Sequence, residues 1–293
     1  MKLKVWGARG SVPAPGPEMN RYGGNTSCVE LELSDGSTLI IDAGTGIRSL
    51  GVGIAQSLPR IHILLTHLHL DHIQGLMFFA PCFRSESEIT IWGPASPEAS
   101  LEERISRYIS APLSPVEVRE LPCGISFRDT PPSEWEIGPA TIHAEAVTHR
   151  GPTLGYRIND GDGTTLTYIS DHEPGLGAPL ESLEPEWISG YDLARDADLL
   201  IHDCQYTDEE YPEHVGWGHS RLSDTLVFAR RVEAHRLLLF HHDPLHSDDF
   251  LDRFHETARE RWAELGGTDG AVEMAAEAQE LQIGAPAKVP AAP

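Results

Sequence analysis

Four groups able to bind a metal ion stand within six residues of this sequence: His67, His69, Asp71 and His72. They follow the apolar run 61–65, which is typical of a strand buried on both faces. Imidazole and carboxylate are the ligands that zinc, manganese and iron accept when no thiolate is offered. A single histidine here would usually be an ordinary hydrogen-bonded residue, but burying four such groups without partners would be costly. The cluster therefore predicts a metal site.

The order His-x-His-x-Asp-His after a hydrophobic strand resembles the signature of the metallo-β-lactamase-fold hydrolases. In an extended chain, alternation would point His67, His69 and Asp71 to the same side. The resemblance implies that His67 and His69 hold one metal ion, and that Asp71 and His72 hold a second. The motif is specific to this superfamily and says little about the substrate.

Three further polar residues come directly after apolar strands: His149, Asp171 and His241. In the family that the motif resembles, such positions supply a third histidine, a bridging aspartate and a last histidine. The implied ligand set is therefore His67, His69 and His149 on one ion, Asp71, His72 and His241 on the other, and Asp171 between them. Asp171 could instead cap a helix, and His242 remains an alternative to His241.

A ligand set of nitrogen and oxygen atoms suits two divalent ions, with zinc as the first choice and manganese or iron as alternatives. Two such ions lower the pKa of a bridging water, so that a hydroxide can attack a phosphodiester at neutral pH. The resemblance also counts Asp71 among the catalytic residues. Asp42, which begins Asp42-Ala43-Gly44, resembles an Asp-x-Gly element that orients the metal-binding histidines.

Two later features resemble the ribonuclease Z and phosphodiesterase branch of this family: Ile201-His202-Asp203 and Gly218-His219-Ser220. The resemblance implies that His219 protonates the leaving oxygen and that Asp203 orients its ring. Asp203 stands where the branch has glutamate, and Arg221 stands where it has threonine. A polar loop histidine is the alternative interpretation of His219.

The glycine-containing loop before residue 28 is a candidate substrate loop. Glycines permit backbone conformations that other residues avoid, so the loop can bring amides and small polar groups to a pocket. Its substrate-binding candidates, together with one from the later motif, are Tyr22, Gly24, Asn25, Thr26 and Ser220. A simple turn into the next strand is the alternative.

The charge and the loop lengths bear on the substrate. The 22 basic and 45 acidic residues give a net charge of −23, which argues against extended nucleic-acid binding. After the strand 154–158 the chain turns at once through 159–163, leaving no room for the protruding arm with which ribonuclease Z grips tRNA. We therefore expect a small phosphodiester, such as a cyclic nucleotide or another cyclic phosphate.

The sequence has four scattered cysteines, and we expect them to be free thiols in a reducing compartment: Cys28, Cys82, Cys123 and Cys204. The first residues lack the apolar core of a signal peptide, and no apolar run is long enough to span a membrane. These features predict a cytoplasmic protein without a membrane partner. Relatives in this branch commonly form dimers, so a homodimer is an open expectation.

The order of elements predicts an α+β fold of two packed mixed sheets with helices outside, an αββα sandwich. We expect one hydrolase domain over residues 1–283 and a disordered Ala/Pro tail over 284–293. Strands are expected at 116–121 and 141–147, helices at 47–57, 73–81, 98–109, 222–234 and 248–265, and a loop at 173–192.

The alternatives to a phosphodiesterase differ in their chemistry. Hydrolysis of a lactone, thioester or β-lactam on the same fold would need no phosphate-directed acid at His219. An RNA 3′-end nuclease would show a steeply salt-dependent affinity for tRNA. A binding protein without catalysis would have no need of seven spaced ligands.

Overall fold

The structure is a computed structural model that describes residues 1–54 and 60–284. The end of the predicted helix 47–57 and nearly all of the predicted tail lie outside these residues.

Two sheets of seven strands each are present in the described part of the chain. The first sheet has the spatial order β14 (Glu280–Gln282), β1 (Lys2–Gly7), β2 (Cys28–Glu32), β3 (Thr38–Ile41), β4 (Arg60–Leu64), β5 (Glu88–Pro94) and β6 (Gly124–Thr130). The second has the order β13 (Val272–Met274), β12 (Leu237–Phe240), β11 (Leu199–Asp203), β10 (Thr165–Ile169), β9 (Leu154–Asn159), β8 (Ala140–Ala146) and β7 (Ser133–Ile137). In each sheet, four neighbouring strands run parallel: β3 to β6 in one and β10 to β13 in the other.

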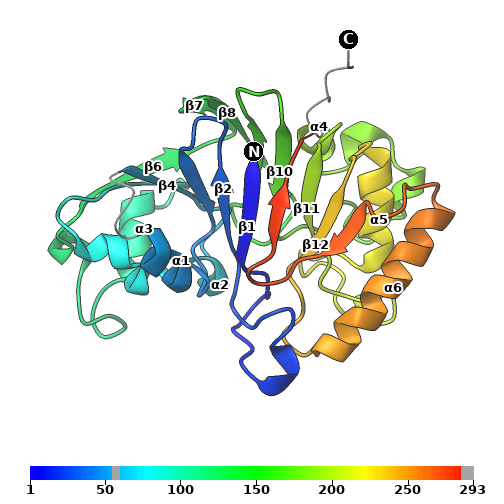
Figure 1. Cartoon of the computed structure of the whole chain (residues 1–293), viewed down its shortest axis with the longest axis horizontal. Helices are drawn as coiled ribbons and strands as arrows, with labels where there is room; N and C mark the ends of the chain where they lie inside the picture. Colours follow the sequence, from blue (N-terminus) through cyan, green and yellow to red (C-terminus); the bar gives the residue numbers. More distant parts are fainter. Residues whose placement is uncertain (55–59, 285–293) are drawn as a thin grey trace, which may run out of the picture.

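The helices cover the outer faces of the two sheets. In Figure 1, α1 (Ile47–Ile54) and α3 (Leu101–Tyr108) lie on the left of the strands, and α5 (Leu222–Arg231) and α6 (Asp248–Glu264) lie on the right. Two single-turn helices, α2 (Leu70–Ile73) and α4 (Tyr191–Ala194), stand in the loops. The predicted αββα fold is confirmed.

Buried apolar side chains fill the space between the sheets and the space under each helical layer. Leu31, Leu39 and Tyr156 belong to the core between the sheets, whereas Ile63 packs under α1 and α3 on the outer side of β4. In β4, Ile61 and Ile63 face the helical layer and Leu64 faces the core between the sheets, whereas Arg60 is exposed and His62 is half-buried.

Three details of the expected element order are wrong. The run 116–121 is not a strand but a short 3-10 turn (Val118–Glu120), and the strand comes later as β6. The expected helix 73–81 is broken into α2 and two 3-10 turns, where Gly75 and Pro81 interrupt the helical hydrogen bonds. The three-residue strands β13 and β14 were missed, since they are too short to show an alternating pattern.

The sheets are joined by tyrosine hydroxyls as well as by apolar contacts. Tyr156 on β9 is fully buried, and its hydroxyl donates a hydrogen bond to the carbonyl of Leu65, 2.7 Å away, just past the end of β4. This bond ties the second sheet to the loop that carries the metal motif.

We predict that Tyr156→Phe destabilises the fold by about 1–3 kcal/mol, because the buried Leu65 carbonyl loses its donor. The half-buried Tyr191 donates to the Arg231 carbonyl, and Tyr191→Phe should cost less because water can replace the hydroxyl. Denaturant unfolding of both variants measures the difference. Equal losses would mean that the inter-sheet bond has no special role.

Candidate metal centre

The motif residues lie where β4 gives way to α2. His67 lies in the loop after β4, and His69, the residue that precedes the helix, is extended, with ψ of 152°. Asp71 and His72 lie in the first turn of α2, so the run is not extended throughout, as the alternating pattern had suggested. The helical turn lets Asp71 and the adjacent His72 both face the same cluster, which an extended chain would not allow.

The first group of potential ligands consists of His67, His69 and His149. Their ligand atoms lie within 4.8 Å of one another. Nε2 of His149, which follows β8, is 3.2 Å from Nδ1 of His69. Three imidazoles meeting in this way match the nitrogen set of a catalytic zinc site.

The second group consists of Asp71, His72, Asp171 and His241. Nε2 of His241 lies 3.3 Å from an oxygen of Asp71 and 3.2 Å from an oxygen of Asp171. Nε2 of His72 lies 3.1 Å from the other oxygen of Asp171. Asp171 also lies 3.8 Å from His67 and 3.7 Å from His149, so it stands between the two groups as the sequence suggested.

Several of the inward-facing atoms lack a hydrogen-bond partner. Nε2 of His67, Nε2 of His72 and Oδ1 of Asp171 are all buried and unsatisfied. The close contact between His72 and Asp171 therefore lacks hydrogen-bond geometry. Unpaired buried polar atoms are costly unless they coordinate a metal, so these donors fit a divalent ion. The four cysteines are buried as free thiols and belong to neither group.

Asp42 holds His72 from behind. Its carboxylate lies 2.8 Å from Nδ1 of His72 and accepts hydrogen bonds from Thr66 and from the hydroxyl of Tyr168. Asp42 is fully buried and has a left-handed φ of 59°, a strained conformation for a residue other than glycine. A carboxylate on the far nitrogen fixes the ring so that Nε2 faces the metal.

The other rings are also held by their far nitrogens. Nδ1 of His149 donates to the carbonyl of Gly218, 2.7 Å away, and Nδ1 of His241 lies 3.1 Å from the amide oxygen of Gln205. Nε2 of His242 instead donates to the carbonyl of Ala275, 2.7 Å away. The structure therefore brings His241, and not His242, to the cluster.

His219 stands beside the cluster with Asp203 behind it. Nδ1 of His219 lies 2.7 Å from Asp203, whose carboxylate also accepts bonds from the backbone amides of His172, Gln205 and Ser220. The ring of His219 stacks on that of His241 with centroids 4.9 Å apart. Ser220 is buried and donates to the carbonyl of His172, so it braces the loop instead of facing a substrate.

A cavity of about 310 Å³ opens onto these groups. Its lining residues are Ser11, His69, Leu70, Asp71, Asp171, His219 and His241. Sequence reasoning missed Ser11 and Leu70. The amide of Ser11 donates to Asp71 over 2.8 Å, a contact between residues 60 positions apart that no local pattern indicates.

The proposed substrate loop is placed elsewhere. The hydroxyl of Tyr22 bonds to Asp252, Asn25 bonds to Glu277, and the hydroxyl of Thr26 accepts from the amide of Thr45. None of these side chains lines the cavity, and neither does Gly24, since a Cβ there would meet the carbonyl of Ala14. In this structure the loop supports the wall of the site from outside.

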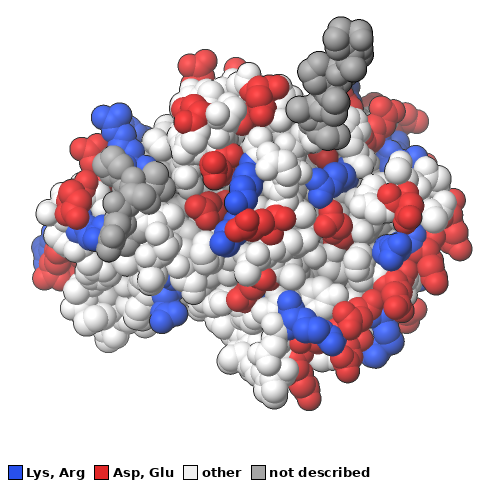
Figure 2. All heavy atoms as spheres, in the orientation of Figure 1, with Lys and Arg blue, Asp and Glu red and all other residues white. Residues whose placement is uncertain are grey.

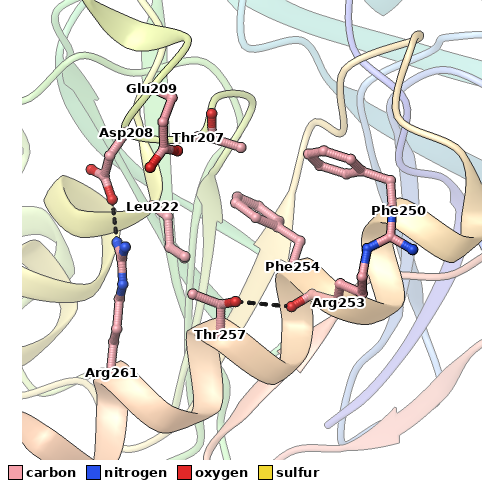
Figure 3. Close-up of a pocket in the computed structure, with 9 residues that line it drawn as sticks. All are labelled: Thr207, Asp208, Glu209, Leu222, Phe250, Arg253, Phe254, Thr257 and Arg261. Carbon is pink, nitrogen blue, oxygen red and sulfur yellow. Dashed lines mark hydrogen bonds and ion pairs between the residues drawn. The ribbon is translucent and has the colours of Figure 1, made fainter.

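A second hollow of about 260 Å³ lies between α6 and the loop at residues 207–209. Figure 3 shows the rings of Phe250 and Phe254 standing between the helix and this loop, with Arg261 paired to Asp208 at one side. None of the metal-ligand candidates lines this hollow. It is not the reaction cavity.

The electrostatics of the metal-free cluster differ between its two groups. Burial lowers the pKa of His67, His69 and His149 in the first group, whereas the second group favours protonated imidazoles. Burial by itself lowers the pKa of His241, but Asp171 and Asp71 outweigh burial and raise that pKa to about 9. The same balance raises the pKa of His72 well above its ordinary value. Burial tends to raise the pKa of Asp71, yet His72 and His241 bring it below the usual range.

Comparison with known proteins identifies the family. Residues 37–242 match the family described as "Beta-lactamase superfamily domain", which is more than half of the chain. The chain belongs to the β-lactamase superfamily. This confirms the predicted family, and with it the predicted class of metal-dependent hydrolase.

Relatives and solved structures of the superfamily cover almost the whole chain. A ribonuclease Z from Kineococcus radiotolerans is 26% identical over 91% of this chain and 90% of its own. The metallo-β-lactamase fold protein YhfI from Bacillus subtilis superposes with a TM-score of 0.67 at 21% identity, covering 96% of this chain and 98% of YhfI. The short form of human tRNase Z gives a TM-score of 0.67 at 21% identity, over 97% of this chain and 100% of the human chain.

The expectation about partners is wrong. We expected a small phosphodiester and no extended nucleic acid, but relatives spanning nine-tenths or more of this chain are named ribonuclease Z. The net charge of −23 misled because it is a sum over the whole chain, whereas a phosphate senses charges within a Debye length of about 8–10 Å. Figure 2 shows acidic side chains gathered along α6, with Lys and Arg scattered over the rest of this face. None of the helices in the described part of the chain is long and apolar enough to span a membrane.

We predict that Asp42→Asn weakens metal binding by about 10–100-fold, because the amide removes the charge that holds His72. Titration with a chromogenic zinc chelator gives the affinity. Asp35→Asn, which alters an exposed turn aspartate, serves as the control. Unchanged affinity in Asp42→Asn would exclude an orienting role for Asp42.

We also predict that metal uptake releases protons at pH 7. His72 and His241 carry protons in the metal-free protein, since their pKa values are raised, and a metal ion needs the neutral rings. Apparent zinc affinity should therefore rise as the pH is raised from 7 toward about 9, the pKa of His241. Calorimetry in buffers of different ionisation enthalpy measures the protons, and a buffer-independent heat would contradict the prediction.

Proposed function

We propose that this chain is a dinuclear, metal-dependent phosphodiesterase whose substrates include RNA. The observation that carries the proposal is the position of His219, which is braced by Asp203 and lines the same cavity as Asp71, Asp171 and His241. A proton donor beside a cluster that fits two metals suits the cleavage of an ester whose leaving oxygen needs a proton.

Each group of residues has its own part in binding the ions. His67, His69 and His149 would hold one ion, Asp71, His72 and His241 would hold the other, and Asp171 would contact both. Bound divalent ions supply Lewis-acid stabilisation of phosphoryl oxygens and lower the pKa of water. Zinc is our first choice, since all the donors are nitrogen or oxygen and three of them are histidines on one ion.

The protein itself orients the donors and moves a proton. Asp203 accepts from Nδ1 of His219, which places the acidic proton on Nε2, the nitrogen free to face the leaving oxygen. As the phosphorus–oxygen bond to the leaving group breaks, that proton passes to the departing oxygen. Asp203 is fully buried and held by three backbone amides, so its charge stays fixed behind the ring.

RNA is the substrate class to test first, because several relatives that match most of this chain are named ribonuclease Z. Cyclic nucleotides and bis(p-nitrophenyl) phosphate are tested beside it, since the same metal cluster and proton donor would act on small diesters as well. Hydrolysis of a lactone or thioester is the alternative, and it would not depend on His219.

We predict that His219→Ala keeps its metal but loses about 10²–10⁴-fold in kcat on an RNA substrate, because the leaving alkoxide goes unprotonated. The loss on bis(p-nitrophenyl) phosphate should be much smaller, since p-nitrophenolate departs without a proton. Steady-state kinetics and metal analysis of the same preparation provide both numbers.

The matched control is His235→Ala, which removes an exposed histidine that also pairs with aspartates but lies on the surface. It should leave both activities unchanged. Full RNA activity in His219→Ala would refute the role of His219, and absence of any phosphodiester cleavage by the metal-loaded protein would refute the proposed function.

A further inference from the structure

Glu173 is a buried carboxylate outside the two groups of metal-ligand candidates. It lies two residues after Asp171 and is 1% exposed. Its backbone amide donates to the carbonyl of Thr148, 3.0 Å away, directly before His149. A buried carboxylate is costly unless strong donors satisfy it, so its contacts indicate what it holds in place.

The donors to Glu173 come from one loop. The amide of Gly216 lies 2.8 Å from one carboxylate oxygen, the amide of Gly218 lies 2.8 Å from the other, and the hydroxyl of Tyr211 donates over 2.7 Å. Burial and the nearby carboxylate raise the pKa of Tyr211, so the phenol stays a donor. Hydrogen bonds to an ionised acceptor are about twice as strong as neutral ones.

The loop at residues 211–219 is closed by turn hydrogen bonds, from the amide of His214 to the carbonyl of Tyr211 and from the amide of Trp217 to the carbonyl of His214, but its tip is exposed. Val215 is 49% exposed and Trp217 is 55% exposed, so apolar burial contributes little at its tip. Gly216 and Gly218 have φ of 81° and 91°, a region in which glycine is favoured, and this backbone turns both amides toward Glu173. The carboxylate thus holds the part of the loop that contains these two glycines, beyond the hydrogen bonds of its turns.

The loop contacts one metal-ligand candidate and carries the proposed acid. The carbonyl of Gly218 accepts from Nδ1 of His149, which leaves Nε2 of that ring bare to face the first metal group. The next residue is His219, the proposed acid. Any shift of Gly218 would move a metal ligand and the acid together.

We propose that Glu173 is a positioning residue that sets the orientation of His149 and His219 through the loop. The His149 part rests on the geometry of the metal cluster, and the His219 part rests on the proposed function. In both cases a change at Glu173 would alter the orientation of a ring that Glu173 does not contact, because Gly218 lies between them.

The test is Glu173→Gln, which keeps the size of the side chain but places an amide donor against the donor N–H of a glycine. We expect about a 10–100-fold loss of metal affinity or of kcat on RNA, as is usual when a group behind a ligand is altered. The visible spectrum of the cobalt-substituted protein should change, because His149 approaches the ion differently. The kcat on bis(p-nitrophenyl) phosphate should fall less than that on RNA.

Asp160→Asn is the matched control, since Asp160 is also a buried carboxylate that holds a remote loop, at Ser34. It should lower the melting temperature and leave the cobalt spectrum and the metal affinity unchanged. Tyr211→Phe removes one of the donors and keeps both glycine amides, so its activity should stay within about threefold of wild type.

The outcomes separate the two proposals. A changed cobalt spectrum in Glu173→Gln without phosphodiester cleavage by the wild type would keep the role of Glu173 and reject the proposed function. A wild-type spectrum, metal affinity and kcat would overturn the role of Glu173. If Glu173→Gln does not fold, hydrogen exchange in the wild type decides: rapid exchange at the Gly216 and Gly218 amides would overturn the proposal, and slow exchange would support it.

Discussion

The carboxylate of Asp171 is the constraint on which the site depends. It is 2% exposed and lies within 4 Å of imidazole nitrogens from His67, His72, His149 and His241. These residues come from three separate parts of the sequence, so the carboxylate can be satisfied only if both sheets bring their strand ends to one point. A buried charge without such partners would cost several kcal/mol. The cluster therefore depends on the packing of the two sheets.

A further set of buried polar groups turns this convergence into a defined geometry. Asp42, Asp203 and Glu173 are each almost fully buried, and each holds a ring or a loop from the side away from the cavity. Tyr168 ties Asp42 to the second sheet through its hydroxyl, 3.0 Å away. Because these anions accept several hydrogen bonds each, they are rigid, and rigid orientation is what a ligand or an acid needs.

Net charge and local chemistry gave different answers about the substrate. The excess of acidic residues is real, yet acidic side chains gather along α6, on the outer face of the second sheet. The cavity has its own acidic groups, Asp71 and Asp171, and these are the ones that fit cations. Composition alone could not distinguish acidic residues on a solvated surface from acidic residues in a metal site, since both add to the same number of Asp and Glu residues.

The sequence by itself determined the family, the fold and most of the cluster. His67 to His72 lie in a run of six residues, and the resemblance to the family's pattern pointed to His149, Asp171 and His241, each just after an apolar strand. Tertiary structure decided what depends on distance between remote residues. It separated His241 from His242, placed Tyr22 and Asn25 outside the cavity, and made Glu173 the anchor of a loop 38 to 46 residues away. Local patterns report which way a side chain points along its own strand, but only packing decides what stands opposite it.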